Sequence, residues 1–217
     1  MITLLDYGAG NVRSVMNAIE SLGETIKVVA TGEDILSAEK LVFPGVGAFG
    51  SMMHILEEKQ YIEPLRTYLK SNRPFFGICL GMQALFEESE EARGVRGLGL
   101  ISGSVKRFSI DLSVPHIGWN GLNIRQPSRI FAGLHGEEKF YFDHSYHVAP
   151  DDDTVVLTTT DYGYNFVSAI QKGPVIATQF HPEKSGNAGL SLLKNFLDTS
   201  IEATMPAQKA EGTRLAK

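Results

Sequence analysis

The only cysteine of this 217-residue chain, Cys79, lies between two glycines in the stretch "FFGICLGMQ". Gly77 stands two residues before it and Gly81 two residues after it. This is the G-x-nucleophile-x-G spacing of a nucleophile elbow, a tight strand-to-helix turn in which larger side chains would collide. A thiol at such a turn faces the unpaired N–H groups of the following helix, which favour the reactive thiolate. The pattern therefore predicts a nucleophile; the alternative is simple packing, since cysteine is often buried.

A nucleophilic thiol needs a base, and one of the six histidines has a suitable position. His181 follows the apolar run "VIATQF", at the end of an expected strand, where ligand crevices form in α/β sheets. Glu183 comes two residues later, on the same side of an extended chain, and can orient the imidazole. Pro182 between them stiffens the pair. The order Cys79, His181, Glu183 predicts a catalytic triad; the alternative is a solvated loop end. The other candidates are His54, His116, His135, His144 and His147.

A second glycine cluster, "GVGAFG" at residues 45–50, has the spacing of a dinucleotide-binding loop. The next strand of that fingerprint, which ends in an acidic residue, is missing. We interpret the cluster as an exposed backbone loop at the carboxyl end of a strand. Such a loop can offer N–H groups to a developing oxyanion. We expect one oxyanion donor from the Leu80 N–H, directly after the nucleophile, and a second from Val46 or Gly47.

The elements that would position these residues alternate in the first half of the chain. Apolar runs predict strands, and apolar residues at helical spacing predict the helices between them. This order predicts a parallel sheet covered on both faces. From about residue 97, short strands separated by turn residues predict an antiparallel section on the same core. We expect an α/β fold with a mostly parallel central sheet. The expected strands are residues 2–7, 25–30, 40–45, 75–78 and 174–180, and the main helices are 12–22, 62–69, 186–201 and one beginning at the elbow.

Composition narrows the possible partners. The formal net charge is −5 and no long basic run is present, so binding of nucleic acid through its phosphates is not expected. No run approaches about 18 consecutive apolar residues, so neither a membrane span nor a signal peptide is expected. A single cysteine excludes an internal disulfide and fits a reducing compartment, such as the cytoplasm. We expect no metal and no cofactor.

Three motifs together, "PGVGAFG", "GICLGMQ" and "FHPEKSG", resemble those of class I (triad) glutamine amidotransferases. Four further stretches, "LLDYGAGNVRSV", "FEESEE", "VPHIGWN" and "HSYH", resemble the glutaminase part of imidazole glycerol phosphate synthase. The resemblance covers residues 2 to about 198. It implies that Cys79 attacks the side-chain amide of glutamine and that His181, oriented by Glu183, protonates the departing ammonia. Water would then resolve the glutamyl thioester.

By their positions in these motifs, five residues resemble glutamine-binding residues of the family: Gly47, Gln83, Glu91, Ser145 and Tyr146. The ammonium group of an amino acid needs an anion, and Glu91 lies in the acidic stretch after the elbow. The alternative is that most of the carboxylates in residues 87–91 only face water at the end of a helix.

The resemblance also implies a partner, a (β/α)8-barrel cyclase. Ammonia would react there with a nucleotide to give imidazole glycerol phosphate and an aminoimidazole carboxamide ribonucleotide. The stretch "PHIGWN" resembles part of the wall that faces this partner, with His116, Trp119 and Asn120. Trp119, the only tryptophan, would suit an anchor in a contact surface. A core tryptophan is the alternative.

The sequence departs from the family pattern in two places. Asp143 stands before "HSY", where an apolar residue is expected, and would either perturb the site or face water. Residues 203–217, "ATMPAQKAEGTRLAK", are polar and follow the expected amidotransferase domain, 1–202. Their composition indicates a flexible linker, and "RLAK" resembles the segment before the first strand of a cyclase barrel. The chain thus resembles a piece of a fused synthase of fungal or plant type, which in a plant would reside in the plastid; a disordered tail is the alternative.

Two other functions compete with this interpretation. The same elbow serves other hydrolases and the glutaminase subunits of other synthases, against which "PHIGWN" argues. A non-catalytic interaction domain belongs to another class of function. It is disfavoured because Cys79, His181 and Glu183 are all present.

Overall fold

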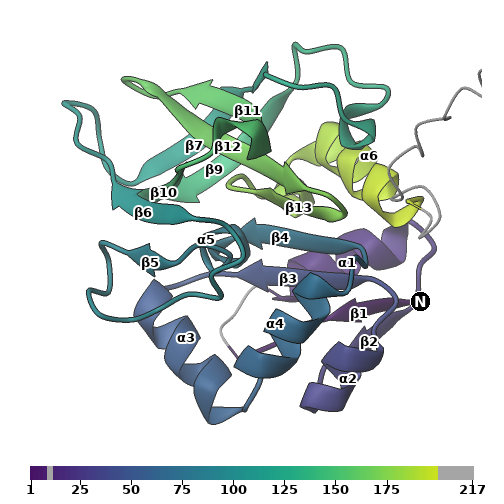
Figure 1. Ribbon diagram of the computed structural model, residues 1–217. Helices are drawn as coiled ribbons and strands as arrows, with labels where there is room; N and C mark the ends of the chain where they lie inside the picture. Colours follow the sequence, from purple (N-terminus) through teal and green to yellow (C-terminus); the bar gives the residue numbers. More distant parts are fainter. Residues whose placement is uncertain (9–11, 200–217) are drawn as a thin grey trace, which may run out of the picture.

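A central sheet organises the chain in the computed structural model, which describes residues 1–8 and 12–199. In these ranges the main sheet has 11 strands, and a smaller sheet of two strands lies beside it (Figure 1). Five neighbouring strands of the main sheet are mutually parallel, as the alternation of strands and helices predicts. In spatial order they are β2 (Ile26–Val28), β1 (Ile2–Leu4), β3 (Leu41–Gly45), β4 (Phe75–Cys79) and β13 (Val175–Thr178).

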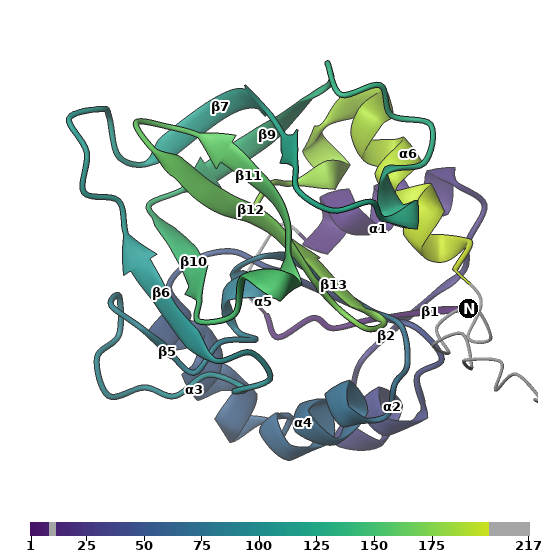
Figure 2. The same ribbon diagram turned by 45° about the horizontal axis from the view of Figure 1, so that its top comes forward.

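Helices cover both faces of the parallel strands (Figures 1 and 2). Successive side chains of a strand point to opposite faces. Phe43 and Phe75 accordingly lie in one hydrophobic core, whereas Val42 and Phe76 lie in the other. The first core is closed by α2 (Gly32–Ser37), α3 (Phe49–Glu58) and α4 (Ile62–Lys70), and the second by α1 (Val12–Ser21) and α6 (Gly186–Leu197).

The second half of the chain adds the expected antiparallel section. One strand, β12 (Asn165–Lys172), pairs antiparallel with β13 and so joins this section to the parallel core. The remaining strands are β5 (Glu88–Ser89), β6 (Gly103–Arg107), β8 (Asn123–Ile124), β10 (Tyr146–Pro150) and β11 (Val156–Asp161), with β7 (His116–Gly121) and β9 (Lys139–His144) in the smaller sheet. Among them, β5 pairs with β6 in parallel. Short 3₁₀ turns cover Arg129–Phe131, Asp153–Val155 and Pro182–Lys184.

The helix after Cys79 is shorter than the apolar spacing indicates. Leu85 and Phe86 continue the helical pattern in the sequence, yet α5 spans only Leu80–Gln83. The carbonyls of residues 84–86 accept hydrogen bonds from the N–H groups of residues 98–101 instead. A Cβ at Gly97 would lie 2.1 Å from the Phe86 oxygen, so glycine lets this segment approach. A contact distant in sequence therefore ends the helix.

The expected linker, residues 203–217, lies outside the described residues. Within the described ranges, no helix is long and apolar enough to cross a membrane.

Candidate active site

Cys79 ends β4 in a strained conformation that presents its thiol at the carboxyl edge of the sheet. Its φ of 54° and ψ of −107° are unusual for a residue with a side chain. Glycines make the turn possible: a Cβ at Gly81 would lie 1.9 Å from the Phe43 oxygen, and one at Gly77 would lie 2.9 Å from the Gly81 oxygen. The predicted elbow is therefore a sterically constrained turn against β3.

His181 reaches the same edge because β13 runs parallel to β4. Their register pairs Thr178 with Ile78, the residue before Cys79. The His181 N–H donates to the Tyr141 carbonyl at 2.9 Å, which ties the chain to β9. The imidazole Nδ1 lies 2.8 Å from Glu183 Oε1, and both side chains are buried. Glu183 achieves this contact from a 3₁₀ turn that begins at Pro182, rather than from the extended chain that the spacing indicates.

The charge state of His181 follows from these neighbours. Burial by itself would lower its pKa, but the charge and hydrogen bond of the Cys79 sulfur, followed by those of Glu183, raise the pKa to about 10. At neutral pH the imidazole is therefore protonated, with Nδ1 toward Glu183 and Nε2 left for the sulfur. An imidazolium beside sulfur favours the thiolate and can later protonate a leaving group.

His181→Ala should slow the alkylation of Cys79 by a glutamine-like electrophile near pH 7, because the thiolate loses its cationic neighbour. Glutamine should protect the wild-type thiol. The measurement is the labelling rate by mass spectrometry, with His54→Ala as control, because His54 is an exposed histidine of α3 paired with Glu58. Equal labelling rates in wild type and His181→Ala would remove His181 from this role.

Three other candidate histidines form a neutral cluster behind the site. Burial lowers the pKa of His116 to about 4 and that of His144 to about 3, and it also lowers the pKa of His147. His144 bonds the Tyr146 carbonyl at 2.8 Å and His116 at 3.2 Å. These histidines pack among aromatic rings and stay uncharged at neutral pH, whereas His181 is protonated and can supply a proton.

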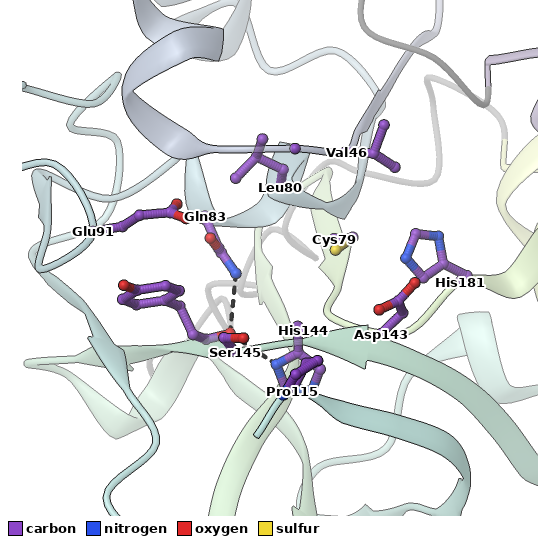
Figure 3. A pocket seen from close by; sticks show the side chains of 12 residues that line it. Val46, Cys79, Leu80, Gln83, Glu91, Pro115, Asp143, His144, Ser145 and His181 are labelled. Atoms are coloured by element: carbon purple, nitrogen blue, oxygen red, sulfur yellow. Dashed lines mark hydrogen bonds between the residues drawn. The ribbon is translucent and has the colours of Figure 1, made fainter. Parts of the chain in front are cut away.

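A pocket of about 300 Å³ opens in front of Cys79 (Figure 3). Cys79 and His181 lie at one end, and Gln83 and Glu91 lie toward the other. The volume is at the small end of the usual range for ligand sites. The lining brings together most of the residues that the motifs single out: Val46, Gly47, Cys79, Leu80, Gln83, Glu91, Pro115, Asp143, His144, Ser145, Tyr146 and His181.

Hydrogen bonds define what two of these side chains can offer to a ligand. Both N–H groups of the Gln83 amide are used, by the Tyr146 carbonyl at 3.1 Å and by Gln179 Oε1 at 3.2 Å. Gln83 therefore presents its oxygen, an acceptor, to the pocket. Glu91 accepts the Phe49 N–H at 2.8 Å through Oε2, at the start of α3, which leaves Oε1 for a cation. Both acceptors suit an ammonium group.

The expected oxyanion loop is held by a tyrosine. The Tyr7 hydroxyl donates to the Val46 carbonyl at 2.9 Å and accepts the Val46 N–H at 3.1 Å. Tyr7 is buried, and burial raises its pKa to about 12, so the hydroxyl keeps its proton. The Val46 N–H is thus engaged with Tyr7 and must leave it before it can serve an oxyanion.

The predicted partner surface is exposed only in part. Ile117 and Trp119, which lie on one face of β7, are 59% and 54% exposed. Asn120 is half-buried, and its amide donates to the Asp161 carbonyl at 2.8 Å. His116 was expected at this surface but is 3% exposed, because β7 turns it inward against Phe142. We call Ile117 and Trp119, with the neighbouring Tyr141, the β7 surface.

The pocket opens at the border of the β7 surface. The pairing of β7 with β9 sets Ile117 opposite Asp143 and Trp119 opposite Tyr141. Asp143 is exposed and also lines the pocket, beside His181 in Figure 3. The unexpected carboxylate thus faces water at the mouth of the pocket.

Tyr7 and Gln179 make contacts at the site but are not among the residues singled out from the sequence. Gln179 is fully buried, and its Nε2 lies 3.5 Å from Cys79 Sγ. The available signal was a polar residue inside the apolar run "VIATQF", two residues before His181. A buried amide needs hydrogen-bond partners, and here one of them is the sulfur.

Comparisons with known proteins show which proteins the chain is similar to. The family model described as "Glutamine amidotransferase class-I" matches residues 3–199. The chain is 48% identical to "Imidazole glycerol phosphate synthase hisHF, chloroplastic" from Arabidopsis thaliana, over 100% of this chain and 37% of that protein. It is also 48% identical to "Imidazole glycerol phosphate synthase subunit HisH" from Syntrophotalea carbinolica, over 91% of this chain and 100% of that protein.

Solved structures show the same fold. A structure described as "Crystal structure of glutamine amidotransferase" has a TM-score of 0.72 at 23% identity, and the match covers 90% of this chain and 96% of that one. This likeness concerns the fold, whereas the family model spans nearly all of the described residues. The chain belongs to the class I glutamine amidotransferases.

Proposed function

We propose that this protein is the glutaminase component of an imidazole glycerol phosphate synthase. It hydrolyses glutamine to glutamate and ammonia, and the ammonia serves histidine biosynthesis. The observation that carries the proposal is the buried Cys79–His181–Glu183 arrangement at one end of a pocket whose other end holds Gln83 and Glu91. Relatives of nearly the same length carry the name of this subunit, which favours it over a glutaminase for another synthase.

The residues divide the chemistry as follows. Glu91 and the Gln83 oxygen receive the α-ammonium group, with Ser145 and Tyr146 beside them, so the side-chain amide extends toward Cys79. The thiolate adds to the amide carbon, and the N–H of Leu80 and that of Val46 or Gly47 stabilise the oxyanion. The C–N bond breaks as His181 transfers its proton to the nitrogen, which leaves as ammonia. Neutral His181 then takes a proton from water, hydroxide attacks the thioester, and glutamate and the thiolate are released.

The β7 surface is where a synthase partner would dock. It exposes Trp119 and Ile117 at the mouth of the pocket, so a docked partner would cover the exit of ammonia. Aromatic residues at the centre of an interface often dominate its binding energy. We infer that the partner is a cyclase with a (β/α)8-barrel fold, which converts the ammonia and a nucleotide into imidazole glycerol phosphate and an aminoimidazole carboxamide ribonucleotide.

The tail and the cellular location follow from the same proposal. We infer a glutaminase domain at residues 1–202 and a linker toward the cyclase at 203–217. The plant relative, whose name joins both components, aligns along the whole chain, which supports a fused protein. One free thiol suits a reducing compartment, which is the cytoplasm, or the plastid for a plant source.

The test compares ammonia release from glutamine and from asparagine, with a cyclase partner present. Asparagine is shorter by one methylene, so it cannot place its ammonium at Glu91 and its amide carbon at Cys79 together. We expect ammonia from glutamine, and a kcat/KM for asparagine lower by at least about 10²-fold, since a displaced reacting group loses most of its rate. Equal rates, or no ammonia from glutamine, would contradict the proposal.

A further inference from the structure

The buried amide of Gln179 lies beside the nucleophile because of strand register. Strands β13 and β4 are parallel, and Thr178 pairs with Ile78. The next residues along the chain, Gln179 just after β13 and Cys79 at the end of β4, therefore lie at the same carboxyl edge. The backbone N–H of Gln179 donates to the Ser168 carbonyl of β12 at 2.8 Å, which fixes the residue from its other side.

The hydrogen bonds determine which way the Gln179 amide faces. Gln83 directs its nitrogen at two oxygens, the Tyr146 carbonyl and Gln179 Oε1, at 3.1 and 3.2 Å. Since the oxygen of Gln179 accepts this bond, its NH₂ group must face away from Gln83. That group meets Cys79 Sγ at 3.5 Å. An unbroken chain of contacts thus joins the Tyr146 carbonyl, Gln83, Gln179 and the sulfur.

An amide donor at this place differs from His181 in one useful respect. His181 loses and regains a proton during the proposed reaction, so its hold on the sulfur changes with each step. The Gln179 amide does not titrate, and it is 0% exposed. A hydrogen bond to an ionised acceptor is roughly twice as strong as one between neutral groups. Burial strengthens it further, because water cannot compete.

We propose that Gln179 is a further catalytic residue, which stabilises the Cys79 thiolate, fixes the sulfur toward the pocket, and links it to Gln83. Its consequence for turnover rests on the proposed glutaminase function. In the resting protein the amide holds the sulfur together with His181. In thioester hydrolysis it stabilises the departing thiolate while His181 is still completing the proton transfer. The contact with Gln83 keeps this donor aimed at the sulfur.

The test uses the pH dependence of Cys79 alkylation by iodoacetamide, which reports one site because the chain has one cysteine. Gln179→Met keeps the length of the side chain but removes both polar groups, and Gln179→Glu sets a carboxylate where the donor was. We expect the pH midpoint of alkylation to rise by about one unit in Gln179→Met, and further in Gln179→Glu. With glutamine, kcat should fall about tenfold or more, and KM should change less than about threefold.

Matched controls come from Gln171 on β12. Its amide is hydrogen-bonded to the Gly173 carbonyl and to Ser128, and the residue does not line the pocket. Gln171→Met and Gln171→Glu should leave the midpoint unchanged. If the two Gln179 variants are folded by circular dichroism and keep the wild-type midpoint, the inference is overturned. Because alkylation needs no glutamine, a wild-type protein that released no ammonia would refute the proposed function alone.

A second measurement needs no variant and covers the case in which substitution unfolds the protein. In the wild-type chain, the side-chain ¹H–¹⁵N amide resonances of Gln179 should titrate with the same midpoint as alkylation. They should also shift when Cys79 is alkylated, while those of Gln171 stay in place. Resonances of Gln179 that remain fixed through both changes would contradict the contact with the thiolate.

Discussion

Cys79→Ala is expected to lower glutamine hydrolysis by on the order of 10⁴-fold or more, because the residues of a triad act as a unit and lose most of their effect together. The fold should persist. Cys79 already adopts a positive φ of 54°, and alanine in the same place adds no larger side chain. Glutamine binding should also persist, since Gln83 and Glu91 hold the other end of the pocket.

The measurement is the steady-state release of ammonia with the cyclase partner present, and glutamine binding by calorimetry. Thermal unfolding of the variant controls for a loss of structure, and Gln171→Met controls for the introduction of a substitution elsewhere. Retention of a tenth of wild-type turnover by a folded Cys79→Ala protein would rule out the covalent mechanism.

The isolated chain is expected to hydrolyse glutamine slowly, and a cyclase partner with its nucleotide ligand should raise the rate by about 10² to 10³, the worth of one oxyanion donor. The structural reason is the double hydrogen bond between Tyr7 and Val46, which keeps the Val46 N–H engaged. A partner on the β7 surface would favour the loop state in which an N–H faces the thioester. Such a population shift needs only a few kcal/mol of differential contact.

Tyr7→Phe tests this switch, since it removes both hydrogen bonds and keeps the ring. The unstimulated rate should rise at least about tenfold, and the stimulated rate should change little. Tyr68→Phe is the matched control, because Tyr68 is equally buried and bonds the Pro74 carbonyl far from the site.

Gly47 has a φ of 93°, which proline cannot adopt, so Gly47→Pro should lower the stimulated rate far more than the unstimulated one. The rate is measured for the chain alone, with the partner, and with the partner plus its nucleotide. Agreement of these three rates within about twofold would refute the switch.

Local patterns in the sequence predicted the elbow, the His181–Glu183 contact and the parallel sheet that carries them. The glycines around Cys79 indicated the elbow because the turn leaves no room for a Cβ at Gly81, a constraint that shows in the five residues from Gly77 to Gly81. The His181–Glu183 spacing indicated their contact, although the chain forms a 3₁₀ turn there. The alternation of strands and helices predicted the parallel sheet, because parallel strands need such crossovers.

Features that depend on distant contacts were not predicted. The helix α5 ends at Gln83 because the N–H groups of residues 98–101 donate hydrogen bonds to the carbonyls of residues 84–86. His116 is buried because β7 pairs with β9 and sets it against Phe142, which no local pattern reveals. The bond from Gln179 to Cys79 depends on the register of two strands that are 100 residues apart in the chain. Register between parallel strands is set by the whole core rather than by either strand.

Hydrolysis of glutamine through a thioester requires a covalent glutamyl group on Cys79 during turnover. The most direct measurement mixes the partner-bound protein with glutamine, quenches with acid at successive times, and maps the modified peptide by mass spectrometry. We expect a glutamyl adduct on Cys79 that forms together with the first equivalent of ammonia, persists during turnover, and disappears when glutamine is exhausted. Two results would contradict the thioester mechanism while ammonia is released at the full rate. One is the absence of an adduct on Cys79 at every quench time, and the other is an adduct on a different residue.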